Sequence, residues 1–138
     1  MIENVSSGHR LVPHDYGNNN SNEIQVWAVP QQTSGRHWNI LPQGGNRYMI
    51  QNQDTKKCMA VSDVGAHFNR VVQRTCNHRA DDQVWWIESE DGSRGSMIIN
   101  TSTREAIVPF NSQPGTLSWA VLEDPTGVDT QLWRFSGL

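Results

Sequence analysis

The 138-residue chain carries little charge and has no long apolar run. Asp, Glu, Lys and Arg make up 18% of the residues and leave a net charge of −3, and no basic run is longer than Lys56-Lys57. A nucleic-acid backbone requires a concentrated basic surface, so we expect no nucleic-acid partner. No segment approaches the roughly 18 consecutive apolar residues of a membrane helix, so we expect no membrane insertion.

Metal-binding and catalytic motifs are also missing. The five histidines are scattered, with no pair at i, i+4 spacing, and the two cysteines do not form a C-x-x-C motif. The chain lacks a Gly-x-Ser-x-Gly nucleophile elbow, a paired-carboxylate signature and a phosphate-binding glycine loop. These absences predict a protein that is not an enzyme and that holds no metal or cofactor.

No stretch of 11 or more residues carries the 3.6-residue apolar period of a helix. Short apolar segments alternate instead with turn-forming clusters such as 17–21 and 91–93, a pattern typical of an all-β fold. The strands expected from this pattern are Gln25–Val29, Arg47–Asn52, Cys58–Ser62, Arg70–Cys76, Gln83–Glu88, Gly95–Asn100, Glu105–Val108 and Gln131–Phe135.

What the chain does contain is a pattern that occurs three times with a period of 48 residues. A Met-Ile pair opens each copy, and an asparagine follows at the same offset. The six positions are Met1, Met49 and Met97, with Asn4, Asn52 and Asn100. Such copies must share one core, because a single unit cannot bury its apolar face. We expect one domain, 1–138, with repeat one at 1–43, repeat two at 44–91 and repeat three at 92–138.

Each copy ends on a tryptophan, at Trp38, Trp85 and Trp133. In the second and third copies a glutamine stands two positions earlier, and Arg36 replaces it in the first. Because residues i and i+2 of a strand share a face, we expect both side chains to point one way and the residue between them to point in the opposite direction. We interpret the tryptophans as core residues and the glutamine amides as ties to neighbouring turns.

A repeat of about 46 residues that opens with Ile-x-Asn, passes through Cys58-Met59-Ala60-Val61 and closes on Gln-x-Trp resembles the ricin-type β-trefoil lectins. The resemblance covers the whole chain. It implies a β-trefoil of about twelve strands in three pseudo-symmetric repeats and a non-catalytic module that binds glycans or glycoconjugates. It further implies that Cys58 and Cys76 form a disulfide, which indicates a secreted, extracellular protein. Repeat one begins directly at its Met-Ile pair, so we expect a domain cut from a longer chain, with any secretion signal upstream.

One departure from the family is found in all three repeats. Family members that bind galactose have an aspartate one position after the residues represented here by Leu11, Met59 and Ile107. This chain has Val12, Ala60 and Val108 at those positions. The main acceptor for sugar hydroxyls is therefore missing from each expected pocket.

Sugar recognition requires an amide or carboxylate for the hydroxyls and an aromatic face for the apolar side of the ring. Other polar and aromatic residues close to the expected pockets offer these groups, although each also fits a solvated turn. The candidates are Asp15, Gln25 and Trp27 in repeat one, Asp63, Gln73, His78 and Asp82 in repeat two, and Asn111 and Trp119 in repeat three.

Two functions remain open at this point. The first is glycan binding at shallow sites, at most one in each repeat. The alternative is a trefoil whose sugar sites are degenerate and which acts as a protein-interaction or assembly subunit, for example of a secreted toxin. A fused or associated catalytic or toxin component is then the expected partner.

Overall fold

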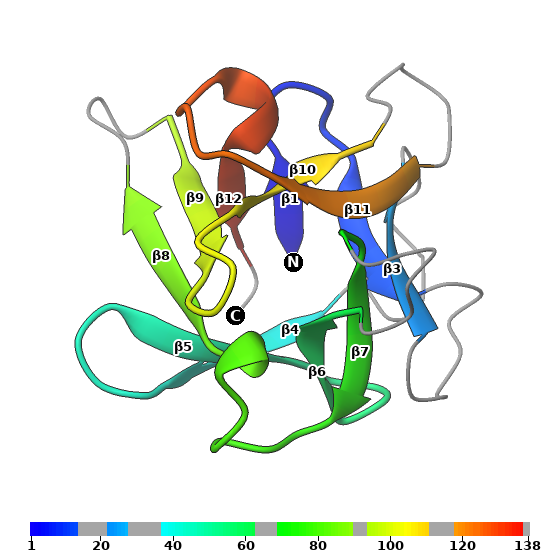
Figure 1. Cartoon of the computed structure of the whole chain (residues 1–138). Coiled ribbons are helices and arrows are strands. Elements are labelled where there is room, and N and C mark those ends of the chain that lie inside the picture. The colour runs from blue at the N-terminus through cyan, green and yellow to red at the C-terminus, as the bar shows by residue number, and fades with distance from the viewer. Residues whose placement is uncertain (14–21, 28–36, 63–68, 90–93, 111–117, 137–138) are drawn as a thin grey trace.

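The computed structural model describes residues 1–13, 22–27, 37–62, 69–89, 94–110 and 118–136, and for 22–27 the backbone alone. It confirms an all-β fold (Figure 1). Within these residues the strands are β1 (Ile2–Asn4), β2 (Arg10–Pro13), β3 (Asn22–Trp27), β4 (Trp38–Pro42), β5 (Arg47–Asn52), β6 (Lys57–Val61), β7 (Val71–Thr75), β8 (Trp85–Ser89), β9 (Ser96–Asn100), β10 (Ala106–Pro109), β11 (Ser118–Glu123) and β12 (Trp133–Phe135). Two short 3₁₀-helices, η3 (Asp81–Gln83) and η4 (Asp129–Gln131), precede β8 and β12.

The strands form one twelve-stranded antiparallel sheet. β1 pairs with β12, which brings the two ends of the chain close together (Figure 1). Three hairpins, β2–β3, β6–β7 and β10–β11, meet because β3 pairs with both β7 and β11. The described residues contain no helix that is long and apolar enough to cross a membrane.

The three closing tryptophans lie in the core, as predicted. All three are fully buried in one apolar cluster. Each indole Nε1 donates to the carbonyl of the hairpin residue in its own repeat. The bonds run from Trp38 to Leu11 (3.0 Å), from Trp85 to Met59 (3.1 Å) and from Trp133 to Ile107 (3.0 Å). The indoles therefore join the hairpins to the strands that follow them.

The repeated asparagines build the turn after the first strand of each repeat. The Oδ1 of Asn52 accepts hydrogen bonds from the backbone N–H groups of Asp54 and Thr55, both at 3.0 Å. Four residues after the asparagine the chain adopts a positive φ, at Gly8 (74°), Lys56 (62°) and Arg104 (62°). A left-handed conformation of this kind suits glycine and is unfavourable for the lysine and the arginine.

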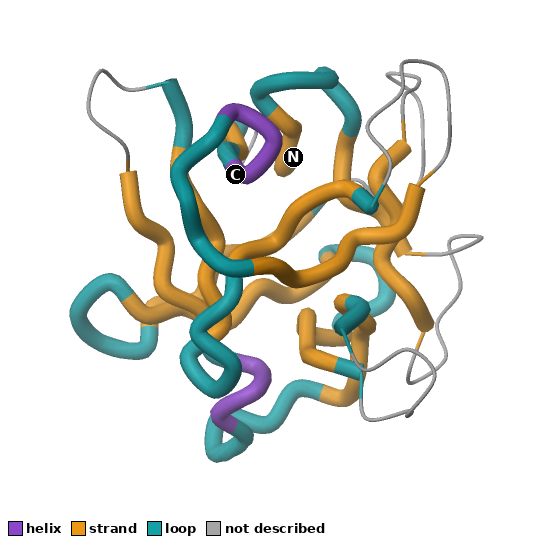
Figure 2. The backbone as a smooth tube through the Cα atoms, turned by 45° about the horizontal axis from the view of Figure 1, so that its top comes forward, coloured by secondary structure: helices purple, strands orange, loops and turns teal. Residues whose placement is uncertain are grey.

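The glutamines of the closing motif differ from the prediction in one respect. Gln83 and Gln131 end the 3₁₀-helices and do not belong to the following strands (Figure 2). The tie to a neighbouring turn is confirmed, since Gln83 donates to the Thr75 carbonyl (3.1 Å) and accepts from the Asn77 N–H (2.8 Å).

The residue between the glutamine and the tryptophan packs in repeat two in a different cluster from the tryptophan. Val84 and Leu132 are buried, and Val84 packs in a second cluster with Met49 and Cys58. Trp85 belongs to the main cluster, so Val84 and Trp85 pack in separate places, which agrees with the expected opposite directions of their side chains.

Cys58 and Cys76 form a disulfide, with 5.0 Å between their Cα atoms. It joins β6 to the residue after β7 and lies beside the cluster of Met49 and Val84. Closing a loop of this length is worth about 3 kcal/mol in the chain-entropy model.

Candidate functional site

The strand registers show which hairpin residues are equivalent. Val12, Ala60 and Val108 pair with Gln25, Val72 and Val121. Two pairs further along, the partners are Trp27, Arg74 and Glu123. The aromatic candidate of repeat one therefore corresponds to an arginine in repeat two and to a glutamate in repeat three.

The position at which galactose-binding relatives have aspartate is closed to solvent in this chain. Val12 is 1% exposed, Ala60 0% and Val108 4%. The apolar side chains at this position are thus part of the packed interior. A sugar bound on these hairpins has to use other acceptors.

An ion pair occupies the polar groups of the expected site in repeat two. Arg74 Nη1 lies 2.9 Å from Asp82 Oδ2, and Arg74 Nη2 also donates to the Val61 carbonyl. The Asp82 carboxylate is therefore engaged within the protein. Asp63 lies outside the described residues.

The suggestion that Gln73 contacts a ligand is wrong for this structure. Gln73 is fully buried, and its Oε1 accepts a hydrogen bond from Thr55 Oγ1 at 2.9 Å. By register it corresponds to Leu122, which belongs to the core. The side chain points inward because successive residues of a strand face opposite sides of the sheet.

An aromatic surface stands at the end of the β10–β11 hairpin. Trp119 is partly exposed, and the Cζ atom of Arg70 lies 4.9 Å from the centroid of its ring. Phe110 is 71% exposed and donates its N–H to the Trp119 carbonyl at 2.8 Å, so the two residues are cross-strand neighbours. Sequence reasoning missed Phe110 and Arg70; only the register across the hairpin and between repeats brings them to Trp119. Asn111 lies outside the described residues.

Glu123 lies at the other end of the same hairpin. Its carboxylate accepts a hydrogen bond from Gln131 Nε2 at 2.7 Å, and the residue is exposed. Glu123 and Trp119 are four positions apart on one strand and therefore share a face. This face offers an aromatic surface at one end and a carboxylate at the other.

The candidates of repeat one are only partly placed. Gln25 and Trp27 belong to β3, where the structure describes the backbone, and Asp15 lies outside the described residues. β3 pairs with β11, with Gln25 opposite Trp119. The backbones of the repeat-one and repeat-three candidates are therefore adjacent.

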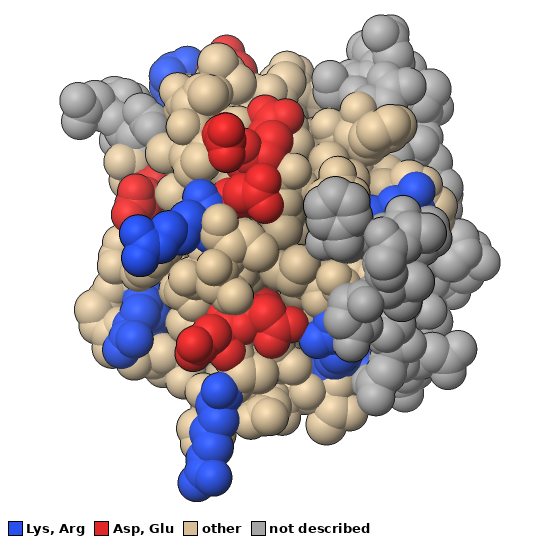
Figure 3. Space-filling view, in the orientation of Figure 1, with Lys and Arg blue, Asp and Glu red and all other residues tan. Residues whose placement is uncertain are grey.

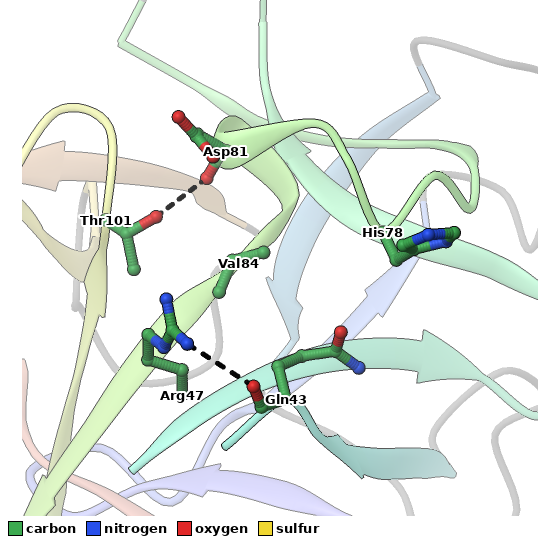
Figure 4. A pocket seen from close by; sticks show the side chains of 6 residues that line it. All are labelled: Gln43, Arg47, His78, Asp81, Val84 and Thr101. Carbon is green, nitrogen blue, oxygen red and sulfur yellow. Dashed lines mark hydrogen bonds between the residues drawn. The ribbon is translucent and has the colours of Figure 1, made fainter. Parts of the chain in front are cut away.

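A shallow pocket of about 130 Å³ lies away from these hairpin faces, and one predicted residue, His78, lines it (Figure 4). The side chains around it are mostly polar. They belong to Gln43, Arg47, His78, Asp81, Val84 and Thr101.

On the face shown in Figure 3, the acidic side chains gather in patches that have basic side chains beside them. Among the described residues, no cluster of three or more His, Cys, Asp or Glu side chains could hold a metal ion.

Comparison with known proteins places this geometry in a family. The family model for the ricin-type beta-trefoil lectin domain-like proteins matches residues 1–69 and 35–116. The chain belongs to this family. No curated protein matches the chain significantly.

Solved structures show that this family member has the β-trefoil fold. The designed threefold-symmetric protein ThreeFoil superimposes with a TM-score of 0.84 at 16% identity, over 96% of this chain and 94% of that one. The Rhizoctonia solani agglutinin gives 0.78 at 21% identity, over 97% and 90%. The Haemophilus ducreyi cytolethal distending toxin gives 0.81 at 16% identity, over 96% and 79%. At such identities the likeness concerns the fold alone.

Proposed function

We propose that this trefoil is a non-catalytic carbohydrate-binding domain. The observation that carries the proposal is the partly exposed ring of Trp119 beside the exposed Phe110 on the β10–β11 hairpin. Aromatic rings exposed beside hydrogen-bonding side chains suit the apolar face of a sugar. Family membership supports the same function, and the similar Rhizoctonia solani protein is an agglutinin.

The proposed site runs along the outer face of this hairpin. Trp119 and Phe110 provide the stacking surface, and Glu123 provides hydroxyl acceptors at the far end of the strand. Asp15, Gln25 and Trp27 form a second proposed site in repeat one, on a strand that pairs with β11. The hairpin of repeat two is left out, because Arg74 and Asp82 satisfy each other there.

Open sites of this type bind weakly. A millimolar affinity corresponds to about −4 kcal/mol, so capture of a glycan surface requires several sites that act together. Two or more sites on one domain would serve this purpose. The disulfide supports an oxidising, extracellular location, where such surfaces are found.

The test is a glycan-array screen of the intact domain beside two tryptophan variants. We expect Trp119→Ala to lose most of the array signal. Trp86→Ala is the matched control, because Trp86 is a partly exposed tryptophan on strand β8, outside the three hairpins β2–β3, β6–β7 and β10–β11. Wild-type array signal in a folded Trp119→Ala variant, or silence of the folded wild-type domain across a broad array, would refute the proposal.

A second candidate function is an assembly subunit with degenerate sugar sites. The burial of Val12, Ala60 and Val108, which leaves no acceptor at the family's position, favours it. The likeness to a cytolethal distending toxin chain agrees with it in fold. A folded domain that binds no glycan but captures a toxin or enzyme component encoded beside it would support this alternative.

A further inference from the structure

The pocket of Figure 4 is built by segments that do not belong to the three hairpins. Gln43 follows β4, Arg47 begins β5, and His78 follows β7. η3 contributes Asp81 and is followed by Val84, and Thr101 closes the pocket from the turn after β9. In Figure 4, Arg47 and Val84 lie between Thr101 on one side and His78 on the other, with Asp81 at the rim.

Several polar groups of this pocket are not engaged by the protein. Among the residues that the structure describes, the Arg47 guanidinium donates only to the carbonyls of Gly44 and Gln43, both at 3.4 Å. These distances exceed the usual N–H···O range of about 2.7–3.2 Å. Within the described residues, neither the His78 ring nor the Asp81 carboxylate has a hydrogen-bond or ion-pair partner. Thr101 Oγ1 donates to the Asp81 carbonyl at 2.9 Å, which leaves its lone pairs free to accept.

Repeat three contains the counterpart of this pocket, in a filled form. Asp129 opens η4 as Asp81 opens η3, but its carboxylate forms an ion pair with Arg94. Strand register places Gly95 where repeat two has Arg47. A Cβ atom on Gly95 would lie 2.8 Å from Val5 Cγ2, so this space is already filled.

Val5 is in turn the counterpart of Thr101. The N–H of Val5 donates to the Leu132 carbonyl (2.9 Å), and the N–H of Thr101 donates to the Val84 carbonyl (3.0 Å). The two repeats thus share the same backbone arrangement around this space. In repeat three an apolar side chain and an ion pair fill it. In repeat two this space is open, and its charged side chains form no ion pair with any other described residue.

We propose that the pocket lined by Arg47, His78, Asp81 and Thr101 binds one uncharged sugar residue of a glycan, at a site separate from the hairpin faces. This inference rests on the proposed carbohydrate-binding function. The guanidinium and the carboxylate carry opposite charges, so neither an anionic nor a cationic ligand is favoured overall. Sugar hydroxyls both donate and accept, which matches this mixture of donors and acceptors. Val84 supplies an apolar surface between them.

An NMR titration of the complete, isotopically labelled chain tests the inference. The probes are the methyl glycosides of galactose, glucose, mannose and N-acetylglucosamine, with glucuronate as the charged probe, each up to about 0.1 M, well above a millimolar dissociation constant. We expect one neutral glycoside to shift the amides of Arg47, His78 and Thr101. Glucuronate should shift them less.

Two variants test the contribution of the guanidinium. Arg47→Gln removes the charge of an exposed side chain, and we expect the affinity at the pocket to fall by about tenfold or more. Arg94→Gln is the matched control, because it removes the arginine of the filled counterpart in repeat three, one position before the equivalent of Arg47, and should leave the affinity unchanged.

Each other result has a separate meaning. Shifts confined to the region of Phe110 and Trp119 would overturn the pocket but leave the proposed function standing. Stronger shifts with glucuronate, or an Arg47→Gln variant that binds like the wild type, would likewise overturn the pocket assignment alone. No shift with any sugar, together with a silent glycan array, would overturn both proposals.

Discussion

Replacement of Trp85 by alanine is expected to unfold much of the population of this domain. Trp85 is fully buried, and its indole Nε1 donates to the Met59 carbonyl at 3.1 Å. Large-to-small substitutions of this kind cost about 3–5 kcal/mol. The Met59 carbonyl also loses its indole donor, which adds about 1–3 kcal/mol if no water replaces it. The total is comparable to the whole stability of a typical domain, about 5–15 kcal/mol.

Urea denaturation followed by far-UV circular dichroism measures this loss without depending on tryptophan emission. Trp86→Ala is the control on the neighbouring position, since Trp86 is only partly buried, and we expect a clearly smaller shift of its midpoint. A Trp85→Ala midpoint equal to that of the wild type would refute the assignment of the closing tryptophans to the core.

Three further predictions concern stability. Burial lowers the pKa of His9, so the unfolded chain binds the proton more tightly than the folded chain does. The free energy of unfolding should therefore be highest above the ordinary pKa of 6.5 and fall as the pH drops below it. Urea titrations between neutral and mildly acidic pH measure this dependence, and His9→Gln should flatten it. Lys56→Gly should raise the free energy of unfolding by up to about 1 kcal/mol, because φ at this position is 62°, whereas Gly8→Ala should lower it by a similar amount; unchanged midpoints in both would contradict the strain argument. Replacement of Cys58 and Cys76 by serine should cost about 3 kcal/mol, and a reduced wild-type sample with an unaltered melting temperature would count against that value.

Sequence alone predicted the fold well because the 48-residue period marks positions that share one packing environment. The closing tryptophans and the opening asparagines recur at fixed offsets, and the structure gives each set one role. The prediction was wrong where a strand rule was applied to a helical turn. Gln83 and Gln131 end the 3₁₀-helices η3 and η4 instead of beginning the strands that follow.

The candidate site was harder to predict, because it depends on register across hairpins whose connections differ between repeats. Gln73 is a polar residue near the expected pocket and was therefore a candidate for sugar binding, yet the alternation of side chains along β7 places it in the core. Trp119 does not correspond to Trp27, whose counterparts are Arg74 and Glu123. The exposed Phe110 precedes its loop without any motif, and its backbone bond to the Trp119 carbonyl shows that the two residues are cross-strand neighbours.

The open pocket beside η3 could not be found from sequence either. His78 was a candidate there, but Arg47 and Thr101 lie far from it along the chain. At this pocket, repeat two and repeat three differ in the position of an arginine, which is shifted by one residue relative to the first strand of the repeat. Arg94 precedes Gly95 and pairs with Asp129, whereas Arg47 occupies the glycine's own position.

The central claim is that the domain binds glycans through aromatic rings at its surface, while its buried tryptophans stabilise the fold. Calorimetric titration of Trp119→Ala with the strongest glycan found on the array tests this claim most directly. We expect an affinity at least about tenfold below that of the wild type, the loss of one stacked aromatic of roughly 1.4 kcal/mol or more, with an unchanged urea midpoint. Wild-type affinity in a folded Trp119→Ala domain would contradict the claim.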